Sequence, residues 1–370
     1  MPNNNNESVY QTRYNAFVKQ LIHHINLTRW PFLCHCLNEF LGTTIFIIIG
    51  SGVMLQTCIG SMENKDVGQF LSISSGWGIA KITGLLISTG GGVGGDSHHH
   101  QYGLLNPALT LACCLIGKLP FRYLLPFSIF QLSGSILGTL IIIGIYWENL
   151  QIYAKIVSFG KLEMNFTGAL FVTTTIPSVS HQSCFMDHIL SSGLFTGLVL
   201  IIKEKHFYNI PFELQIIYIG LVTTGIIGSL SLNIGVALNP ARDLGARLAI
   251  SLCGWGIQPF KANNYYFWLP LVGPYIGALI GSFFYVIVIS IHVSKINNDE
   301  EIKQENDECN TTTIIDSTVN YLQSSLVEEM TADLFDINEV DDCFTTTTTS
   351  SSSSSSNSST PTDSGDETLY

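Results

Sequence analysis

The tetrapeptide Leu-Asn-Pro-Ala occurs twice in this chain, in QYGLLNPALT from Gln101 to Thr110 and in GVALNPARDL from Gly235 to Leu244. Each copy follows an apolar run of the kind that crosses a membrane. Asn is a preferred helix N-cap, and Pro is tolerated in the first helical turn because its missing N–H would have no partner there. Each copy therefore predicts the start of a helix at a point where a membrane span has just ended.

The composition indicates a polytopic membrane protein. Of the 370 residues, 46% are hydrophobic and only 12% are charged, and the mean hydropathy is +0.33. The formal net charge of -12 is unevenly distributed, because residues 299–370 hold 17 of the 28 acids and a single base. The rest of the chain is only slightly basic, which argues against the strongly positive surface that nucleic-acid binding requires.

Six segments approach the roughly 20 apolar residues that a helix needs to cross the hydrocarbon core. They are rich in Gly, Ser and Thr, and such small residues let helices approach one another closely in lipid. We therefore expect a tight bundle of six spans, at residues 34–57, 70–89, 124–145, 186–202, 212–231 and 267–292.

The spacing of two acidic residues suggests an internal repeat. Glu39 lies in the first span and Asp187 in the fourth, and we interpret both as buried structural acceptors because an intramembrane acid is costly. They precede Asn106 and Asn239 by 67 and 52 residues respectively. Each half then contains three spans, and this odd number inverts the second half in the membrane.

The apolar run after each motif is about ten residues long, which at 1.5 Å per residue spans about half of the bilayer. We therefore expect two re-entrant half-helices that meet near the midplane. The predicted fold is an all-α integral membrane protein with six transmembrane helices, two re-entrant half-helices and an inverted repeat.

Lys and Arg residues flank the first, third and fourth spans on one side, which predicts that both termini are cytoplasmic. Asn165 then lies in the longest outer loop, in an Asn-Phe-Thr glycosylation sequon. The expected domains are a cytoplasmic segment (1–33), a channel domain (34–293, with repeats at about 34–146 and 186–293) and a disordered, acidic, Ser/Thr-rich cytoplasmic tail (294–370) that could bind cytoplasmic partners.

The two motifs predict the chemistry of a pore. Two Asn amides would donate hydrogen bonds at its centre, where two helix N-termini add positive partial charge. The carbonyls of about residues 102–105 and 235–238 would offer acceptors. Such a pore passes neutral, hydrogen-bonding solutes, repels cations and interrupts a proton wire. The predicted pore motifs are Asn106, Pro107, Ala108, Asn239, Pro240 and Ala241.

Residues 34–292 resemble the major intrinsic protein family of aquaporins and glycerol facilitators. The resemblance rests on the paired motifs, on NEFLGT, GWGIA and NPARD, on Gln131 in IFQLSGSILG, and on PLVGPYIGALIGSFFY. Asp243, Arg247, Pro270 and Leu271 match its aquaglyceroporin branch. The resemblance implies a passive channel for water and glycerol-type solutes that excludes ions and protons. It also implies a homotetramer in the lipid bilayer, here assigned to the plasma membrane, with no cofactor and no enzyme activity.

By the same resemblance, Arg242 is the arginine of the selectivity filter. Val236 and Ile227 are further filter candidates from their spacing to Asn239. Ser75 stands where the family commonly has an aromatic ring, and Trp77, two residues later, is the alternative.

The chain departs from the family before the first motif, where Leu104 replaces the usual His and an inserted loop carries His98 to His100. That loop reads as a solvated polar segment, with a pH-dependent gate as the alternative and no metal expected. Three alternatives to the glycerol channel stay open at this point: a water-only channel, a secondary transporter and a non-conducting scaffold.

Overall fold

The computed structural model describes residues 9–24, 30–62, 69–90, 103–204 and 210–292, with a few helical residues between 316 and 324. The predictions for the His98–His100 loop lie outside the described residues, as do nearly all of those for the tail from residue 294. Within the described residues, helices are the regular structure, and the single β-bridge joins Thr175 to Ile234.

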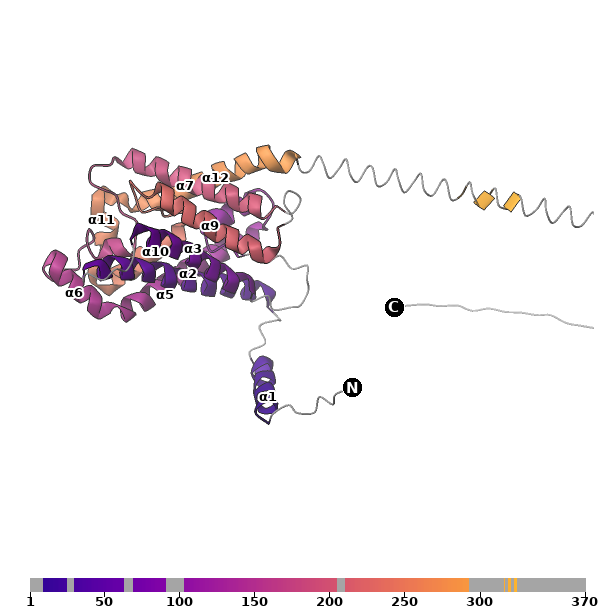
Figure 1. Ribbon diagram of the computed structural model, residues 1–370, viewed down its shortest axis with the longest axis horizontal. Coiled ribbons are helices and arrows are strands. Elements are labelled where there is room, and N and C mark those ends of the chain that lie inside the picture. The colour runs from indigo at the N-terminus through magenta and orange to yellow at the C-terminus, as the bar shows by residue number, and fades with distance from the viewer. Residues whose placement is uncertain are drawn as a thin grey trace, which may run out of the picture. The chain divides into compact units, whose positions relative to one another are not determined.

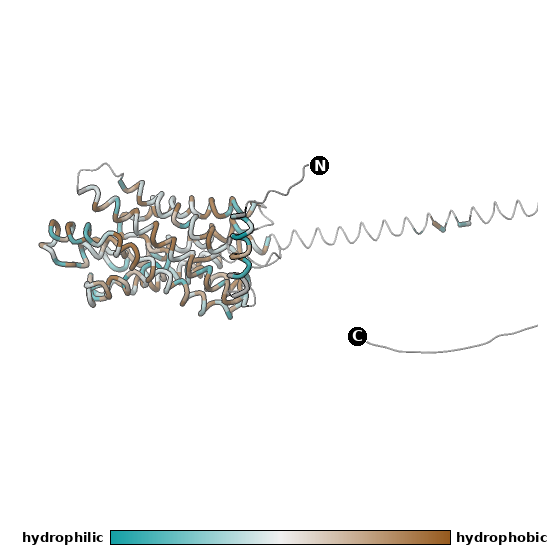
Figure 2. Tube along the Cα trace, turned by 90° about the horizontal axis from the view of Figure 1, so that it is seen from below, coloured by the Kyte–Doolittle hydropathy of each residue, from teal (hydrophilic) through white to brown (hydrophobic). Residues whose placement is uncertain are grey.

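Six helices are long and apolar enough to cross a membrane, and they pack side by side in one bundle (Figure 1). Apolar residues run along these helices (Figure 2). All six predicted spans are confirmed, with ends shifted by a few residues. The helices are α2 (Pro31–Met62), α3 (Phe70–Gly90), α5 (Leu124–Ile145), α7 (His181–Ile202), α9 (Phe212–Leu230) and α12 (Leu269–Tyr285), the last continued by a π-helical turn (Val286–Ser290). Helix α1 (Val9–His24) precedes them along the chain.

Both predicted half-helices are present. Helix α4 (Pro107–Leu115) begins after Asn106, and α10 (Pro240–Ile250) begins after Asn239. Each half-helix packs against both α5 and α12, the third spans of the two halves. Because each half supplies one wall for the half-helix of the other, the two repeats form a single interlocked body.

Glycine pairs set the close approach between spans. A Cβ added to Gly42 of α2 would lie 2.6 Å from the carbonyl oxygen of Gly84 of α3, and one on Gly84 would lie 2.7 Å from that of Gly42. Gly78 of α3 would meet the Gly220 carbonyl oxygen of α9 at 2.7 Å. No side chain fits at these crossings, as expected for helices that pack through small residues in lipid.

The connection between α5 and α7 and the connection between α10 and α12 contain more helical structure than the sequence indicates. The segment after α5 contains α6 (Trp147–Ser158), which ends at Phe159 in the left-handed conformation, and a 3-10 turn (Gly168–Leu170). After α10 come a π-helical turn (Ser251–Trp255) and α11 (Gln258–Tyr265). These segments cover one end of the bundle and supply part of the site described below.

Candidate functional site

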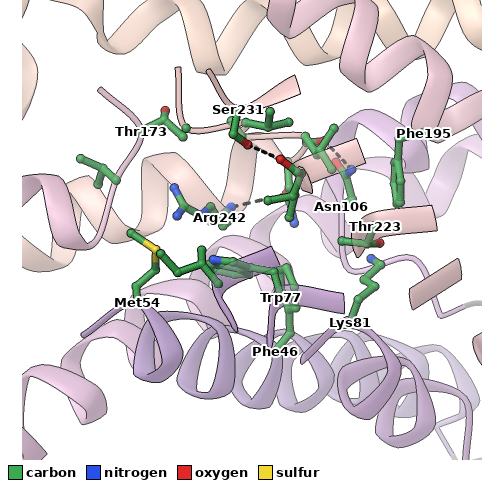
Figure 3. Close-up of a pocket in the computed structure, with 18 of the residues that line it drawn as sticks. Phe46, Met54, Trp77, Lys81, Asn106, Thr173, Phe195, Thr223, Ser231 and Arg242 are labelled. Carbon is green, nitrogen blue, oxygen red and sulfur yellow. Dashed lines mark hydrogen bonds between the residues drawn. The ribbon is translucent and has the colours of Figure 1, made fainter. Parts of the chain in front are cut away.

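A cavity of about 290 Å³ lies between the two halves of the bundle, beside the paired motifs (Figure 3). Both Asn106 and Asn239 line it, together with side chains of α2, α3, α7 and α9 and the connection before α7. Its lining carries two cationic residues, Lys81 and Arg242, and no Asp or Glu. The cavity is therefore lined both by the neutral amides of the two asparagines and by two basic side chains.

The side-chain amides of the two asparagines are each hydrogen-bonded to both halves of the inverted repeat. Each Oδ1 accepts a hydrogen bond from its own half-helix, since Asn106 caps Ala108 and Asn239 caps Ala241, both at 3.0 Å. Each Nδ2 donates to the opposite motif, from Asn106 to the Leu238 carbonyl at 2.8 Å and from Asn239 to the Leu105 carbonyl at 2.6 Å. The amide orientations are therefore fixed from both sides.

The leucine before each asparagine has a strained backbone. Leu105 has φ 54° and Leu238 has φ 53°, in the left-handed region that costs a non-glycine residue about 1–2 kcal/mol. This turn directs each leucine carbonyl at the asparagine of the other half. The strain is thus tied to the crossed hydrogen bonds, and it occurs in both copies of the repeat.

Glu39 acts as the predicted acceptor. It is fully buried, and its two oxygens accept from the backbone N–H groups of Leu104 and Leu105 at 2.8 and 2.7 Å. Ser88 and Gln131 donate to the same carboxylate at 2.9 and 2.6 Å. Four donors offset the cost of burying the charge and hold the extended backbone that leads into α4.

The matching prediction for Asp187 as a buried acid is wrong. Asp187 is only partly buried, and its carboxylate accepts from Asn233 Nδ2 at 2.7 Å. The next residue, His188, is fully buried, and its Nε2 lies 2.9 Å from the Tyr266 hydroxyl. One residue is a 100° turn of the helix, so the two side chains cannot face the same way.

Asp243 and Arg247 form a buried clamp. Arg247 Nε lies 2.6 Å from Asp243 Oδ2, at the predicted i,i+4 spacing. Asp243 Oδ1 also accepts from the N–H and hydroxyl of Thr173, while the Arg247 guanidinium donates to the carbonyls of Thr173 and Pro259. The clamp fastens the segment around Thr173, which lines the cavity, to α10.

The predicted filter residues are only partly gathered at the cavity. Arg242, Trp77, Val236 and Ile227 all line it, and the Arg242 guanidinium lies 4.8 Å from the centre of the Trp77 ring. Ser75 does not line it, and its hydroxyl donates to the Leu71 carbonyl. Two residues along a helix rotate by about 200°, so only one of Ser75 and Trp77 can face the cavity.

Two lysines occupy carbonyls that the sequence assigns to a free acceptor ladder. Lys81 Nζ donates to the Leu104 carbonyl at 2.9 Å, and Lys203 Nζ donates to the Gly103 carbonyl at 3.4 Å. Sequence reasoning passed over Lys81, although a lone lysine inside an apolar span is a recognised signal of a functional position. Of these two lysines, Lys81 lines the cavity.

The remaining predicted positions lie away from the cavity lining. Pro270 and Leu271 are in the first turn of α12, and Asn165 is exposed just before the 3-10 turn at Gly168–Leu170. No cluster of three or more His, Cys, Asp or Glu side chains placed to hold a metal is found in the part of the chain that the structure describes.

The fold and the paired motifs agree with comparisons to known proteins. The model of the Major intrinsic protein family matches residues 26–285, which include both repeats. This chain belongs to the major intrinsic protein family. Aquaporin-9 of Homo sapiens is 36% identical over 259 residues, covering 69% of this chain and 82% of the relative.

Two further members of the major intrinsic protein family support this assignment. Aquaporin-10 of Homo sapiens is 32% identical over 259 residues, covering 70% of this chain and 81% of the relative. The X-ray structure of the aquaglyceroporin from Plasmodium falciparum is similar with a TM-score of 0.60 and 26% identity, covering 71% of this chain and 99% of that one. The similarity therefore spans the whole bundle.

Proposed function

We propose that this protein is a passive channel for water and small uncharged solutes of the glycerol type. The observation that carries the proposal is the pair of crossed asparagines, Asn106 and Asn239, beside the cavity that Arg242 lines. Relatives named aquaporin and a similar structure titled an aquaglyceroporin support it.

The geometry supplies a mechanism. An asparagine amide has two N–H groups, and in each motif one of them donates to the opposite leucine carbonyl. The second remains for a passing water or hydroxyl, which must then accept at the centre of the pore. Two half-helix N-termini raise the potential there, so a cation is repelled and a chain of water molecules cannot pass a proton.

The glycerol branch is favoured by side chains at the second half-helix and in the first turn of α12. The Asp243–Arg247 clamp holds Thr173 at the cavity, and Pro270 and Leu271 also match that branch. Trp77 stacked on Arg242 gives an apolar face beside a multi-donor cation, which suits a polyol with carbon on one side and hydroxyls on the other.

Stopped-flow permeability to water, glycerol and urea in proteoliposomes tests the proposal, with Arg242→Val as the comparison variant. We expect glycerol flux well above that of empty liposomes, and altered selectivity in Arg242→Val because the filter loses its cation. Water flux without glycerol flux would favour the water-only channel. Uptake that saturates and requires an ion gradient would favour a transporter, and no flux at all would favour a scaffold.

We further infer a homotetramer in the plasma membrane, with a pore in each subunit, both termini cytoplasmic and glycosylation at Asn165. The charge distribution around the spans supports the orientation. The tail is assigned to cytoplasmic partners, and no enzyme activity is proposed. Crosslinking in native membranes tests the tetramer. Glycosidase treatment should increase the electrophoretic mobility of the wild type but not that of Asn165→Gln, which tests the glycosylation and the orientation.

A further inference from the structure

Helix α1 has an exposed aromatic stripe, formed by Tyr10, Tyr14 and Phe17. The three residues are spaced i, i+4 and i+7, so at 100° per residue they lie within about 60° of one another around the helix. Their side chains are 84%, 62% and 62% exposed. Aromatic rings carry a large apolar surface, and three of them aligned on one face indicate a surface on which the helix lies.

The other faces of α1 are polar and positively charged. Lys19 comes nine residues after Tyr10 and therefore lies on the opposite side of the helix, while Arg13 lies at the edge of the aromatic stripe. Both basic side chains are exposed, and the sequence of the helix contains no Asp or Glu. Aromatic residues on one face and Lys and Arg on the other are typical of helices that lie in a membrane–water interface.

The chain itself keeps α1 close to the membrane. Helix α1 ends at His24, and the first membrane span begins at Pro31. Trp30, the residue before that span, is 66% exposed, and Trp is enriched at the level of the lipid headgroups. The chain from His24 to Trp30 can extend over at most about 20 Å. The end of α1 therefore stays within that distance of the membrane surface.

A helix of this length and composition needs a surface to be stable. Helix α1 has 16 residues, and isolated helices of about 12–15 residues are marginal in water even when they are rich in Ala. Helix α1 has a single Ala, Ala16, and contains several weaker helix formers such as Tyr, Asn, Thr and Val. Its stability must then come from packing of its amphipathic face. The aromatic stripe is exposed and offers that face.

We propose that α1 binds the anionic phospholipid surface of the membrane that the bundle spans. The aromatic stripe enters the boundary between headgroups and acyl chains, and Arg13 and Lys19 are attracted to the phosphate and carboxylate groups of the lipids. This charge selects the cytoplasmic leaflet, which carries the anionic lipids and lies on the side proposed for the N-terminus. Each base near such a surface strengthens binding about fivefold. The binding does not depend on which solute the pore passes.

Hydrogen exchange of the full chain in lipid nanodiscs tests this surface. The backbone amides of α1 are compared at about pH 7.5, where histidine is mainly neutral, in nanodiscs of phosphatidylcholine with and without phosphatidylserine. We expect the amides of α1 to exchange at least about fivefold more slowly in the anionic nanodiscs, because a bound helix is protected. High salt should remove most of this difference, since it screens exposed charges.

Two double variants separate the contributions of charge and stripe. Arg13→Gln with Lys19→Gln removes the charge, and Tyr14→Ser with Phe17→Ser removes most of the stripe. Each should reduce the slowing to less than about twofold. Lys155→Gln, which removes an exposed lysine of α6, is the control and should keep the full effect. Slow exchange in the spans shows in each case that the bundle is folded.

Two results would overturn the proposal. One is equal exchange of α1 in the two lipid compositions, and the other is full slowing in either double variant. Calcium-loaded calmodulin serves as a probe for the rival occupant, an acidic helix-binding protein. Protection of α1 by this probe in phosphatidylcholine nanodiscs, with no effect of phosphatidylserine, would assign the helix to a protein partner instead.

Discussion

Asn106 and Asn239 each use both ends of one amide. The oxygen caps the residue's own half-helix, and the nitrogen donates to the other half. An aspartate in the same place could cap the helix, but it would set a carboxylate against a carbonyl oxygen. An alanine would leave the cap and the carbonyl without a partner. Hence asparagine alone satisfies both contacts and still has an N–H for a solute.

Asn106→Ala should destabilise the folded protein by about 1–3 kcal/mol, the cost of leaving buried polar groups unsatisfied. Leu238 loses the donor to its carbonyl, and Ala108 loses its cap. Thermal unfolding in detergent measures the change, and stopped-flow measures the accompanying loss of permeability. Asn165→Ala, at an exposed position, is the control. An Asn106→Ala protein with wild-type stability would contradict the role of the crossed bonds.

The clamp between Asp243 and Arg247 is a contact within one helix that organises a second segment. Because both side chains are 2% exposed, removing Asp243 leaves the charge of Arg247 buried without its carboxylate partner. We expect Asp243→Ala to cost about 3–5 kcal/mol. The double variant with Arg247→Ala should cost clearly less than the sum of the two single variants. Urea or thermal unfolding of all four proteins measures this coupling, and additive losses would contradict it.

Helix crossings supply a test with a matched control. Gly42→Ala places a Cβ 2.6 Å from the Gly84 carbonyl oxygen, so α2 and α3 must separate. Gly225→Ala, in α9, meets nothing within 4 Å and should be neutral or stabilising by up to about 1 kcal/mol through helix propensity. Expression level and thermal stability in detergent compare the two. Equal behaviour would show that close approach at Gly42 is not required.

Sequence patterns predict the elements better than the facing of single residues. The length of the apolar runs predicts all six spans, and Asn-Pro predicts both half-helices, because these signals are local. The burial of Asp187 is predicted wrongly, and the choice between Ser75 and Trp77 stays open in the sequence, because a shift of one or two residues turns a helix by 100° or 200°. The contact of Thr173 with Asp243 spans 70 residues, and no local pattern encodes it.

The two halves depend on each other throughout the bundle. Helix α4 packs on α12 and α10 packs on α5, in addition to the crossed asparagine bonds. The segment that connects the two halves contains an exposed turn at Phe159. This residue is 98% exposed and is followed by Gly160 with φ 83°. A break there severs the chain at a surface turn without removing a contact of the cavity.

Co-expression of residues 1–159 with residues 160–370 should therefore restore glycerol permeability, whereas either fragment alone should give none. Proteoliposome flux after co-purification through a tag on one fragment measures the outcome. A fragment that conducts by itself would show that one repeat builds a pore without the other.

The crossed bonds also impose an order on biosynthesis. The acceptor of Asn106 is the carbonyl of a residue made 132 positions later, so the first half-helix enters the membrane before its partner exists. Until then the cell holds a chain with an unsatisfied amide at the bilayer midplane, where lipid offers no hydrogen bond. The first half-helix therefore cannot complete its hydrogen bonds while it is being translated. The pore excludes cations only after the second motif has been synthesised.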